Sequence, residues 1–160
     1  MCGIIGIHST IKNEKIFYEI FEGLMCLQHR GQDSVGISNE ESVRKYDGLV
    51  KYAFQHENLD SQPCQNYMGH VRYGTNGLTN NIQPLYTIFP RRISLCHNGN
   101  ITNTQEVKDI IYNTYRILLD TQSDSEIILS VFSCKLYELL NKNGNEITED
   151  KIFIVTNFLH

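Results

Sequence analysis

The spacing of apolar residues predicts a chain that mixes helices with short strands. Ile16, Ile20 and Leu24 recur at every fourth position, which places them on one face of a helix. We therefore expect a helix over residues 14–29, ended by Gly31 in the left-handed conformation that glycine tolerates. Apolar runs that are too short for helices predict strands at residues 3–8, 35–38, 43–46, 49–54, 68–73, 93–97 and 151–156.

Two later helices are predicted by their start signals. Ser123 with Glu126 matches the capping box, in which side chains at a helix start bind its unpaired backbone amides, and Asn103 with Glu106 suggests a similar cap. The apolar positions expected along these helices are Val107, Ile110, Ile111, Tyr115 and Leu118 in the first, and Ile128, Phe132, Leu136 and Leu139 in the second. Because helices and strands are intermixed without a strict βαβ alternation, the pattern favours an α+β fold.

Composition limits the classes of function. The 160 residues suit one domain, and a content of 41% hydrophobic and 20% charged residues is typical of a soluble globular protein. A formal net charge of -4 without a basic patch argues against a nucleic-acid partner. No apolar run is long enough to span a membrane, and the start of the chain lacks the features of a signal peptide. The five cysteines are widely spaced and predict no disulfide framework, which favours a reducing, cytoplasmic location.

Cys2 is the first candidate for chemistry. It directly follows Met1, and if Met1 is removed it carries both a thiol and a free α-amine. An α-amine titrates at about 7.7–8.0, so it can accept the thiol proton near neutral pH. Nucleophiles activated by their own terminal amine perform acyl transfer. The alternative that Cys2 alone leaves open is an incidental cysteine at the second position.

Two arginines stand in polar segments that contain glycine. Arg30 and Gly31 follow the first predicted helix, where they either line a pocket or form an ordinary helix cap and turn. Arg72 ends a predicted strand, and an arginine in such a place can bind a carboxylate through two hydrogen bonds. The following loop contains Thr75 and is rich in glycine and asparagine, so it can act as a mobile lid. The alternative is a surface arginine before an ordinary loop.

Two further segments offer hydrogen-bond donors and a negative charge. Asn98 and Gly99 follow an apolar strand, and their side-chain amide and backbone N–H can form an oxyanion hole, although Asn-Gly is also a common turn. Asp124 lies in the first turn of the last helix. There it can bind a substrate ammonium group, or it can simply be stabilised by the helix dipole. No cysteine or histidine pair has the spacing of metal ligands, so a metal site is not expected.

Five short motifs follow one another in a specific order. They are Cys2-Gly3-Ile4, His29-Arg30-Gly31-Gln32-Asp33, Gly69-His70-Val71-Arg72-Tyr73, His97-Asn98-Gly99-Asn100 and Ser123-Asp124-Ser125-Glu126. In this order they resemble the motifs of class II glutamine amidotransferases. Within that class, the His-Arg-Gly-Gln-Asp, His-Asn-Gly-Asn and Ser-Asp-Ser-Glu wordings are most similar to the glutaminase domain of the amidophosphoribosyltransferases, which act in purine biosynthesis.

The resemblance implies a fold and a reaction. The fold is the αββα sandwich of the N-terminal nucleophile hydrolases, and the reaction is hydrolysis of L-glutamine to L-glutamate and ammonia, with no cofactor and no metal. By resemblance, Cys2 attacks the glutamine amide and forms a thioester, while Asn98 and Gly99 stabilise the oxyanion.

The resemblance also assigns the residues that bind the substrate. Arg72 is expected to hold the α-carboxylate of glutamine and Asp124 its α-ammonium group. Thr75 is expected to add a polar contact, and Arg30 and Gly31 are expected to lie beside the nucleophile. This agrees with the requirement of a zwitterion for one cation and one anion in the site.

The resemblance is incomplete. Relatives carry an Asp-Pro-x-Gly-x-Arg-Pro segment and a phosphoribosyltransferase domain, and neither occurs in residues 1–160. We therefore expect residues 1–160 to be a partial, C-terminally truncated type 2 glutamine amidotransferase domain that passes ammonia to a separate synthase or phosphoribosyltransferase chain. Gly74 also replaces the Pro or Ala usual before the lid threonine. Alternatives are a non-catalytic homologue that binds glutamine or a partner protein, and a hydrolase of another amide.

Overall fold

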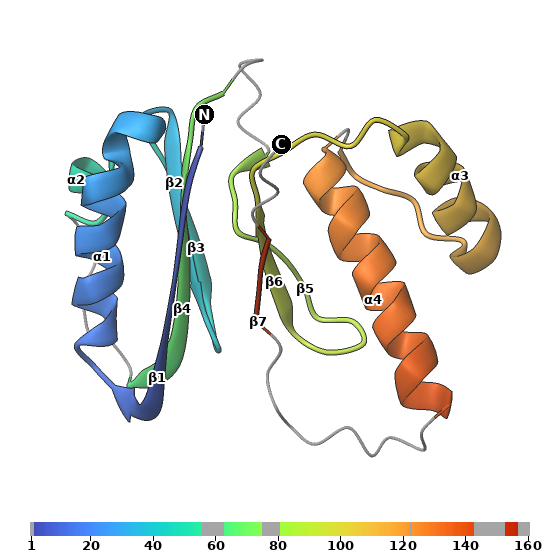
Figure 1. Ribbon diagram of the computed structural model, residues 1–160, viewed down its shortest axis with the longest axis horizontal. Helices are drawn as coiled ribbons and strands as arrows, with labels where there is room; N and C mark the ends of the chain where they lie inside the picture. The colour runs from blue at the N-terminus through green and yellow to red at the C-terminus, as the bar shows by residue number, and fades with distance from the viewer. Residues whose placement is uncertain (1, 56–62, 75–80, 122, 143–152, 157–160) are drawn as a thin grey trace.

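The chain folds into four layers, with helices on the outer faces of two β-sheets that face each other (Figure 1). The computed structural model describes residues 2–55, 63–74, 81–121, 123–142 and 153–156. This arrangement confirms the α+β class and the αββα sandwich expected from the sequence.

The first sheet has four antiparallel strands in the order β1-β4-β2-β3. These strands are β1 (Gly3–Asn13), β2 (Ser34–Asn39), β3 (Val43–Asp47) and β4 (Cys64–Arg72). The helical elements on its outer side are α1 (Ile16–Leu27), the 3₁₀ helix η1 (Gln28–Arg30) and the short α2 (Val50–Ala53). Because Gly3 pairs with Val71, Cys2 lies at the same end of the sheet as Arg72.

The second sheet has three strands in the order β5-β6-β7. They are β5 (Leu85–Thr87), β6 (Ile93–His97) and β7 (Phe153–Thr156), with β5 antiparallel and β7 parallel to β6. Helix α4 (Asp124–Lys142) covers the outer face of this sheet, and α3 (Thr104–Tyr115) packs against α4 (Figure 1). No helix in the described part of the chain is long and apolar enough to cross a membrane.

The first apolar core lies between α1 and the sheet that it covers. Its α1 side chains are Ile16, Phe17, Ile20 and Leu24, all of them buried as the four-residue spacing predicts. Phe17 meets Phe54 edge to face with ring centroids 6.1 Å apart, a geometry that aromatic pairs prefer. Leu24 reaches down to Gly69 of β4, where a Cβ would lie only 2.9 Å from the leucine side chain. The core thus holds α1 close to the strand that ends at Arg72.

A second apolar core lies between α4 and the second sheet. Ile93 and Leu95 of β6 pack there against Leu129, Leu136 and Leu140 of α4. Burial of this kind stabilises the fold by about 25 cal/mol for each Å² of apolar surface removed from water. It therefore fixes the strand that leads into Asn98 and Gly99.

The space between the two sheets contains buried polar groups. Ser38 Oγ of β2 and Ser94 Oγ of β6 are 2.6 Å apart, and both residues are buried. Leaving such a hydroxyl unpaired would cost about 1–3 kcal/mol. The hydrogen bond therefore favours one alignment of the two sheets.

The strand predicted over residues 49–54 is wrong, because the short helix α2 lies there instead. Leu49 has an extended backbone, but the backbone N–H of Val50 donates to Gln28 Oε1 at 2.6 Å, and one helical turn follows. Phe54 then packs into the first core. Apolar periodicity does not distinguish a strand from a buried helical turn in so short a run. Strand β5 was not predicted, because its three residues are too few to show a periodic pattern.

The predicted left-handed conformation of Gly31 is also wrong. Its φ is -161° and its ψ is 129°, which is extended backbone. Helix α1 ends by tightening into η1, where the N–H of Gly31 donates to the carbonyl of Gln28 at 3.2 Å. The chain therefore needs glycine here for a different reason, which the site geometry supplies.

The cap predicted at Asn103 and the capping box predicted for Ser123 and Glu126 are not found among the hydrogen bonds of the described residues. Asn103 makes no side-chain hydrogen bond to the start of α3. The Glu126 carboxylate accepts hydrogen bonds from the backbone N–H groups of Asp120 and Thr121, both at 2.7 Å, instead of returning to Ser123. Glu126 therefore holds the turn that leads into α4, while the N–H of Ser123 donates to Thr121 Oγ1 at 3.0 Å.

The predicted apolar faces of α3 and α4 are only partly correct. Ile111 and Leu136 are buried, but Ile110 is 54% exposed and Leu139 is 52% exposed. Leu118 lies beyond the end of α3 and is 78% exposed. Spacing identifies the helices, but it does not determine which side meets the sheet.

The difference between predicted and observed core positions can be measured. We expect Leu24→Ala to lower the free energy of unfolding by about 2–5 kcal/mol, because it removes a fully buried side chain from a packed core. Leu139→Ala removes the same atoms from a half-exposed position and should cost about 1 kcal/mol. Urea unfolding of both variants tests this, and equal losses would contradict the described core.

Candidate active site

The carbonyl oxygen of Cys2 lies at a junction between the two sheets. It accepts a hydrogen bond from Arg30 Nε at 3.0 Å and another from Asn98 Nδ2 at 3.3 Å. Arg30 ends η1 beside the first sheet, whereas Asn98 directly follows β6 of the second. Cys2 is partly exposed. A nucleophile at this position is therefore held from two sides and is still accessible to solvent.

Gly31 allows the loop after η1 to lie directly on the end of β4. A Cβ at Gly31 would lie 2.5 Å from the carbonyl carbon of Arg72 and 2.6 Å from that of Val71, and backbone atoms cannot yield as a flexible side chain can. The N–H of Asp33 then donates to the carbonyl of Arg72 at 3.0 Å. Glycine is therefore required by the close approach of two backbone segments, which places Arg72 next to the loop that contacts Cys2.

The Arg72 side chain points to the segment that follows the glycine-rich loop. Its Nη1 donates to the backbone carbonyl of Asn81. A guanidinium group has five N–H donors, so Arg72 keeps donors for a carboxylate. Thr75, the predicted lid contact, lies outside the described residues.

Asp124 begins α4 and turns its carboxylate toward the chain that follows β6. Its Oδ2 accepts a hydrogen bond from the N–H of Ile101 at 3.2 Å, and its Oδ1 lies 3.7 Å from His97 Nδ1. A Cβ at Gly99 would lie 2.8 Å from His97 Nε2, so glycine lets the turn fold back on the imidazole. The turn after β6 is therefore packed against the start of α4, where the helix dipole favours a carboxylate.

The predicted site residues thus fall into two sets: those joined by hydrogen bonds at Cys2, and those that contact neighbouring segments of the same region. The residues joined by hydrogen bonds are Cys2, Arg30 and Asn98. Gly31 touches the backbone of Arg72, and Asp124 touches the turn that contains Gly99. Within the described part of the chain, no hydrogen bond joins Arg72 or Asp124 to Cys2. The predicted site residues that the structure describes all belong to one end of the sandwich.

Three buried residues in this region were not predicted as site residues. They are Gln83, His97 and Ser125. Ser125 Oγ lies 3.1 Å from Gln83 Nε2 and 3.2 Å from His97 Nδ1. His97 and Ser125 lie within two of the five sequence motifs, which could have identified them. Gln83 had no comparable signal, because its importance depends on contacts far along the sequence.

Burial separates Cys2 from three of the other cysteines. Burial raises the pKa of the Cys64, Cys96 and Cys134 thiols, so these thiols stay protonated and are poor nucleophiles at neutral pH. Cys26 is exposed on α1, on the outer side of the first sheet. Cys2 is therefore the partly exposed thiol at the junction between the two sheets.

His70 of β4 is fully buried on the strand that ends at Arg72. Neither of its ring nitrogens has a hydrogen-bond partner among the described residues. Burial lowers the pKa of His70 to about 3, and Arg72 and His97 act in the same direction. The imidazole is therefore neutral near neutral pH and adds no charge beside Arg72.

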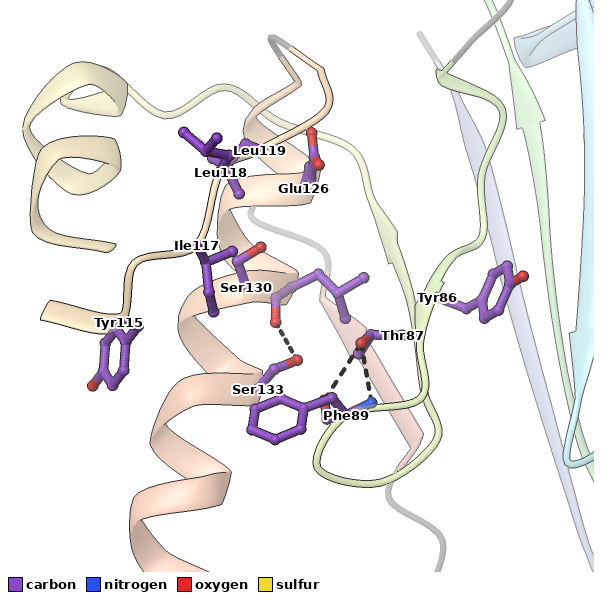
Figure 2. Close-up of a pocket in the computed structure, with 11 residues that line it drawn as sticks. Tyr86, Thr87, Phe89, Tyr115, Ile117, Leu118, Leu119, Glu126, Ser130 and Ser133 are labelled. Carbon is purple, nitrogen blue, oxygen red and sulfur yellow. Dashed lines mark hydrogen bonds between the residues drawn. The ribbon is translucent and has the colours of Figure 1, made fainter. Parts of the chain in front are cut away.

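A separate pocket of about 550 Å³ lies beside α4, the segment that follows α3, and β5 (Figure 2). Most of its lining is aromatic or aliphatic, including Tyr86, Phe89 and Leu118. Glu126 is its charged lining residue, and both of its carboxylate oxygens accept hydrogen bonds from the preceding turn. Without a free cation and anion, this pocket does not suit an amino-acid zwitterion. Among the described residues, no three His, Cys, Asp or Glu side chains are grouped to hold a metal ion.

Comparison with known proteins gives a consistent set of relatives. No protein-family model matches the chain. An amidophosphoribosyltransferase from Pseudomonas aeruginosa is 36% identical and is matched over 100% of this chain and 32% of its own length. The Escherichia coli enzyme of that name is 38% identical over 85% of this chain and 28% of its own length. The Saccharomyces cerevisiae enzyme is 32% identical over 96% of this chain and 31% of its own length.

Solved structures agree with these relatives. A glutamine phosphoribosylpyrophosphate amidotransferase from B. subtilis, complexed with ADP and GMP, superposes with a TM-score of 0.65 at 30% identity, over 81% of this chain and 28% of that one. A structure described as the allosteric regulatory enzyme of purine biosynthesis superposes with a TM-score of 0.66 at 32% identity, over 80% of this chain and 28% of that one.

Fold and similarity together define the class, which is that of the N-terminal nucleophile, or class II, glutamine amidotransferases. Within this class, the chain is homologous to the glutaminase domain of amidophosphoribosyltransferase. It spans about a third of the length of the curated relatives that it matches.

Burial of neutral His70 should make stability depend on pH. The unfolded chain takes up a proton at about pH 6.5, whereas the folded chain excludes it until about pH 3. Stability should therefore fall with decreasing pH in this window, by up to about 1.4 kcal/mol for each pH unit. Urea unfolding between pH 7 and 5 measures the slope.

The contribution of His70 can be isolated by substitution. His70→Gln should reduce the slope by one proton, whereas His29→Gln, at an exposed position, should keep the wild-type slope. A wild-type slope in His70→Gln would show that this imidazole does not control the effect.

Proposed function

We propose that the chain hydrolyses the side-chain amide of L-glutamine to L-glutamate and ammonia, with Cys2 as the nucleophile after removal of Met1. The observation that carries this proposal is the pair of hydrogen bonds at the Cys2 carbonyl, from Arg30 and from Asn98. They bring an accessible thiol residue next to a side-chain amide that can stabilise an oxyanion. The similarity to proteins named glutamine phosphoribosylpyrophosphate amidotransferase supports the same reaction.

The proposed reaction begins with a proton transfer within one residue. The α-amine of Cys2 accepts the thiol proton, and the sulfur attacks the amide carbon of glutamine to form a carbon–sulfur bond. The electron pair of the C=O bond moves to the oxygen and gives a tetrahedral oxyanion. When the carbon–nitrogen bond breaks, the ammonium form of the amine protonates the leaving nitrogen, so ammonia and a thioester result. Water then cleaves the thioester, which releases glutamate and restores the thiol.

The oxyanion is assigned to Asn98 and Gly99. Asn98 Nδ2 already points to the backbone of the nucleophile, 3.3 Å from the Cys2 carbonyl, and the N–H of Gly99 is the next donor along the turn. Preorganised donors of this kind act where charge develops in the transition state. The turn carries them on a strand end that is packed into the second core.

The two charged ends of glutamine are assigned to Arg72 and Asp124. Arg72 keeps guanidinium donors for the α-carboxylate beside its bond to Asn81. Asp124 uses Oδ2 to hold the turn, and its Oδ1, 3.5 Å from Ser125 Oγ, has a further lone pair for the α-ammonium group. Arg30 and Gly31 form the wall beside the nucleophile, and Thr75 is proposed as a further contact.

The ammonia produced here is proposed to serve a transfer reaction. The relatives are named for a phosphoribosyl transfer, so the proposed acceptor is a phosphoribosyltransferase or another synthase site, reached from residues 1–160 by diffusion or by contact with a separate chain.

The identity of the nucleophile can be tested by a matched pair of variants. Cys2→Ala should reduce glutamate formation to background, because the neighbouring Cys96 thiol is buried and burial raises its pKa, so it stays protonated. Cys26→Ala should retain wild-type activity, since its exposed thiol lies on the outer helix α1. Intact mass measured on the same samples should show loss of Met1.

Two outcomes would overturn this assignment. Equal activity in the wild type and Cys2→Ala would exclude the thiol. Calorimetric binding of glutamine by the processed wild type without glutamate formation would favour a non-catalytic homologue.

The roles of the oxyanion and ammonium contacts should separate in kinetics. Asn98→Ala should lower kcat by about 10²–10³ with little change in KM, because its donor acts mainly in the transition state. Asp124→Asn keeps an oxygen for Ile101 but loses the charge, so it should mainly raise KM, by about tenfold or more. Initial rates across glutamine concentrations measure both effects. The reverse pattern would show that the two roles are wrongly assigned.

A further inference from the structure

Gln83 uses both ends of its side-chain amide in a buried network. Its Oε1 accepts a hydrogen bond from the backbone N–H of His97 at 2.6 Å, and its Nε2 donates to Ser125 Oγ at 3.1 Å. Gln83 is only 8% exposed. One side chain therefore joins the end of β6 to the start of α4.

The orientation of this amide follows from chemistry. A backbone N–H can only donate, so the atom of Gln83 that faces His97 must be the oxygen. The NH₂ group must then face Ser125, whose hydroxyl accepts. A rotated amide would set two donors against each other in a buried place, which is costly. Gln83 is therefore locked in a single orientation by the main chain of the turn.

Ser125 extends the network to the proposed substrate-binding carboxylate. Because its oxygen accepts from Gln83, its own proton is free to point at His97 Nδ1, 3.2 Å away, or at Asp124 Oδ1, 3.5 Å away. His97 ends β6 and Asp124 begins α4, so the two acceptors belong to the two elements that Gln83 joins. The position of Asp124 is thus coupled to the side chain of Gln83 through one hydroxyl.

The backbone of the same segment contacts the first sheet. The carbonyl oxygen of Gln83 lies 2.1 Å from where a Cβ of Gly36 would be, so β2 accepts the segment only because it has glycine there. Two residues earlier, the carbonyl of Asn81 accepts a hydrogen bond from Arg72. Residues 81–83 therefore touch Arg72 on one sheet and the last residue of β6 on the other.

We propose that Gln83 is a positioning residue that holds three parts of the site in register: Arg72, the Asn98–Gly99 turn and Asp124. This inference rests on the proposed glutamine hydrolysis, because those three parts are its carboxylate, oxyanion and ammonium contacts. Gln83 itself touches the reacting groups only through His97, Ser125 and its own segment. Displacement of a site by about 1 Å from a distance can lower a rate by about 10²-fold, so the network controls turnover without taking part in it.

The test uses Gln83→Met, which keeps the size of the side chain and removes both hydrogen bonds, and Ser125→Ala, which removes the hydroxyl. The matched control is Ser38→Ala, because Ser38 is also buried between the sheets and bonds to Ser94 but not to this network. We expect Gln83→Met and Ser125→Ala to lower kcat/KM for glutamine by about 10–100-fold, through both a lower kcat and a higher KM. Ser38→Ala should stay within about threefold, and Ser125→Thr, which keeps the hydroxyl, should recover most of the activity.

A spectroscopic measurement distinguishes failure of this inference from failure of the proposed function. In ¹H–¹⁵N spectra of the folded proteins, Gln83→Met should move the backbone amide signals of His97, Gly99 and Ile101, whereas Ser38→Ala should leave them in place. Those shifts with an inactive wild type would refute the glutamine hydrolysis and keep the network. Unmoved signals, or, with an active wild type, kinetics in Gln83→Met that match those of Ser38→Ala, would overturn the positioning role.

Discussion

The site depends on the Cys2 carbonyl being bound from both sheets at once. The first residues of a chain usually fray, because few contacts hold them. Here β1 pairs with β4 from Gly3 onward, and Arg30 and Asn98 donate to the carbonyl just before that pairing begins. A nucleophile at the end of a chain can therefore be as well positioned as one inside a strand. The donors that hold it come from the same turns as the proposed oxyanion hole and pocket wall.

Apolar and polar burial are separated in this sandwich. The two apolar cores lie between each sheet and its helices, where burial drives folding without regard to direction. The space between the sheets instead holds directional contacts, such as Ser38 with Ser94 and Gln83 with Ser125. Hydrogen bonds in such surroundings are strong when paired and costly when unpaired. This division lets the outer layers supply stability, while the Gln83 network in the inner layer is proposed to align the site.

Burial keeps two titratable side chains of this region, His70 and Cys96, uncharged near neutral pH. His70 stays neutral because it is enclosed near Arg72, so it adds no further positive charge there. The buried thiol of Cys96 is kept protonated in the same way. The carboxylate of Asp124 accepts a hydrogen bond from the backbone N–H of Ile101. In the proposed function, Arg72 and Asp124 supply the cation and the anion that a free amino acid requires.

Sequence alone determined the order of the motifs, the family, and the elements with strong patterns, such as α1 and β6. Local spacing and residue chemistry suffice for these, because a helical face or an Asn-Gly turn is encoded within a few residues. Tertiary structure decided the rest. Residues 49–54 became a helical turn because Gln28 binds Val50, Gly31 is needed because β4 passes beneath it, and Gln83 matters because β6 and α4 meet it. Each of these depends on contacts between segments distant along the chain. The neighbouring residues in the sequence do not indicate which distant segment a residue will contact.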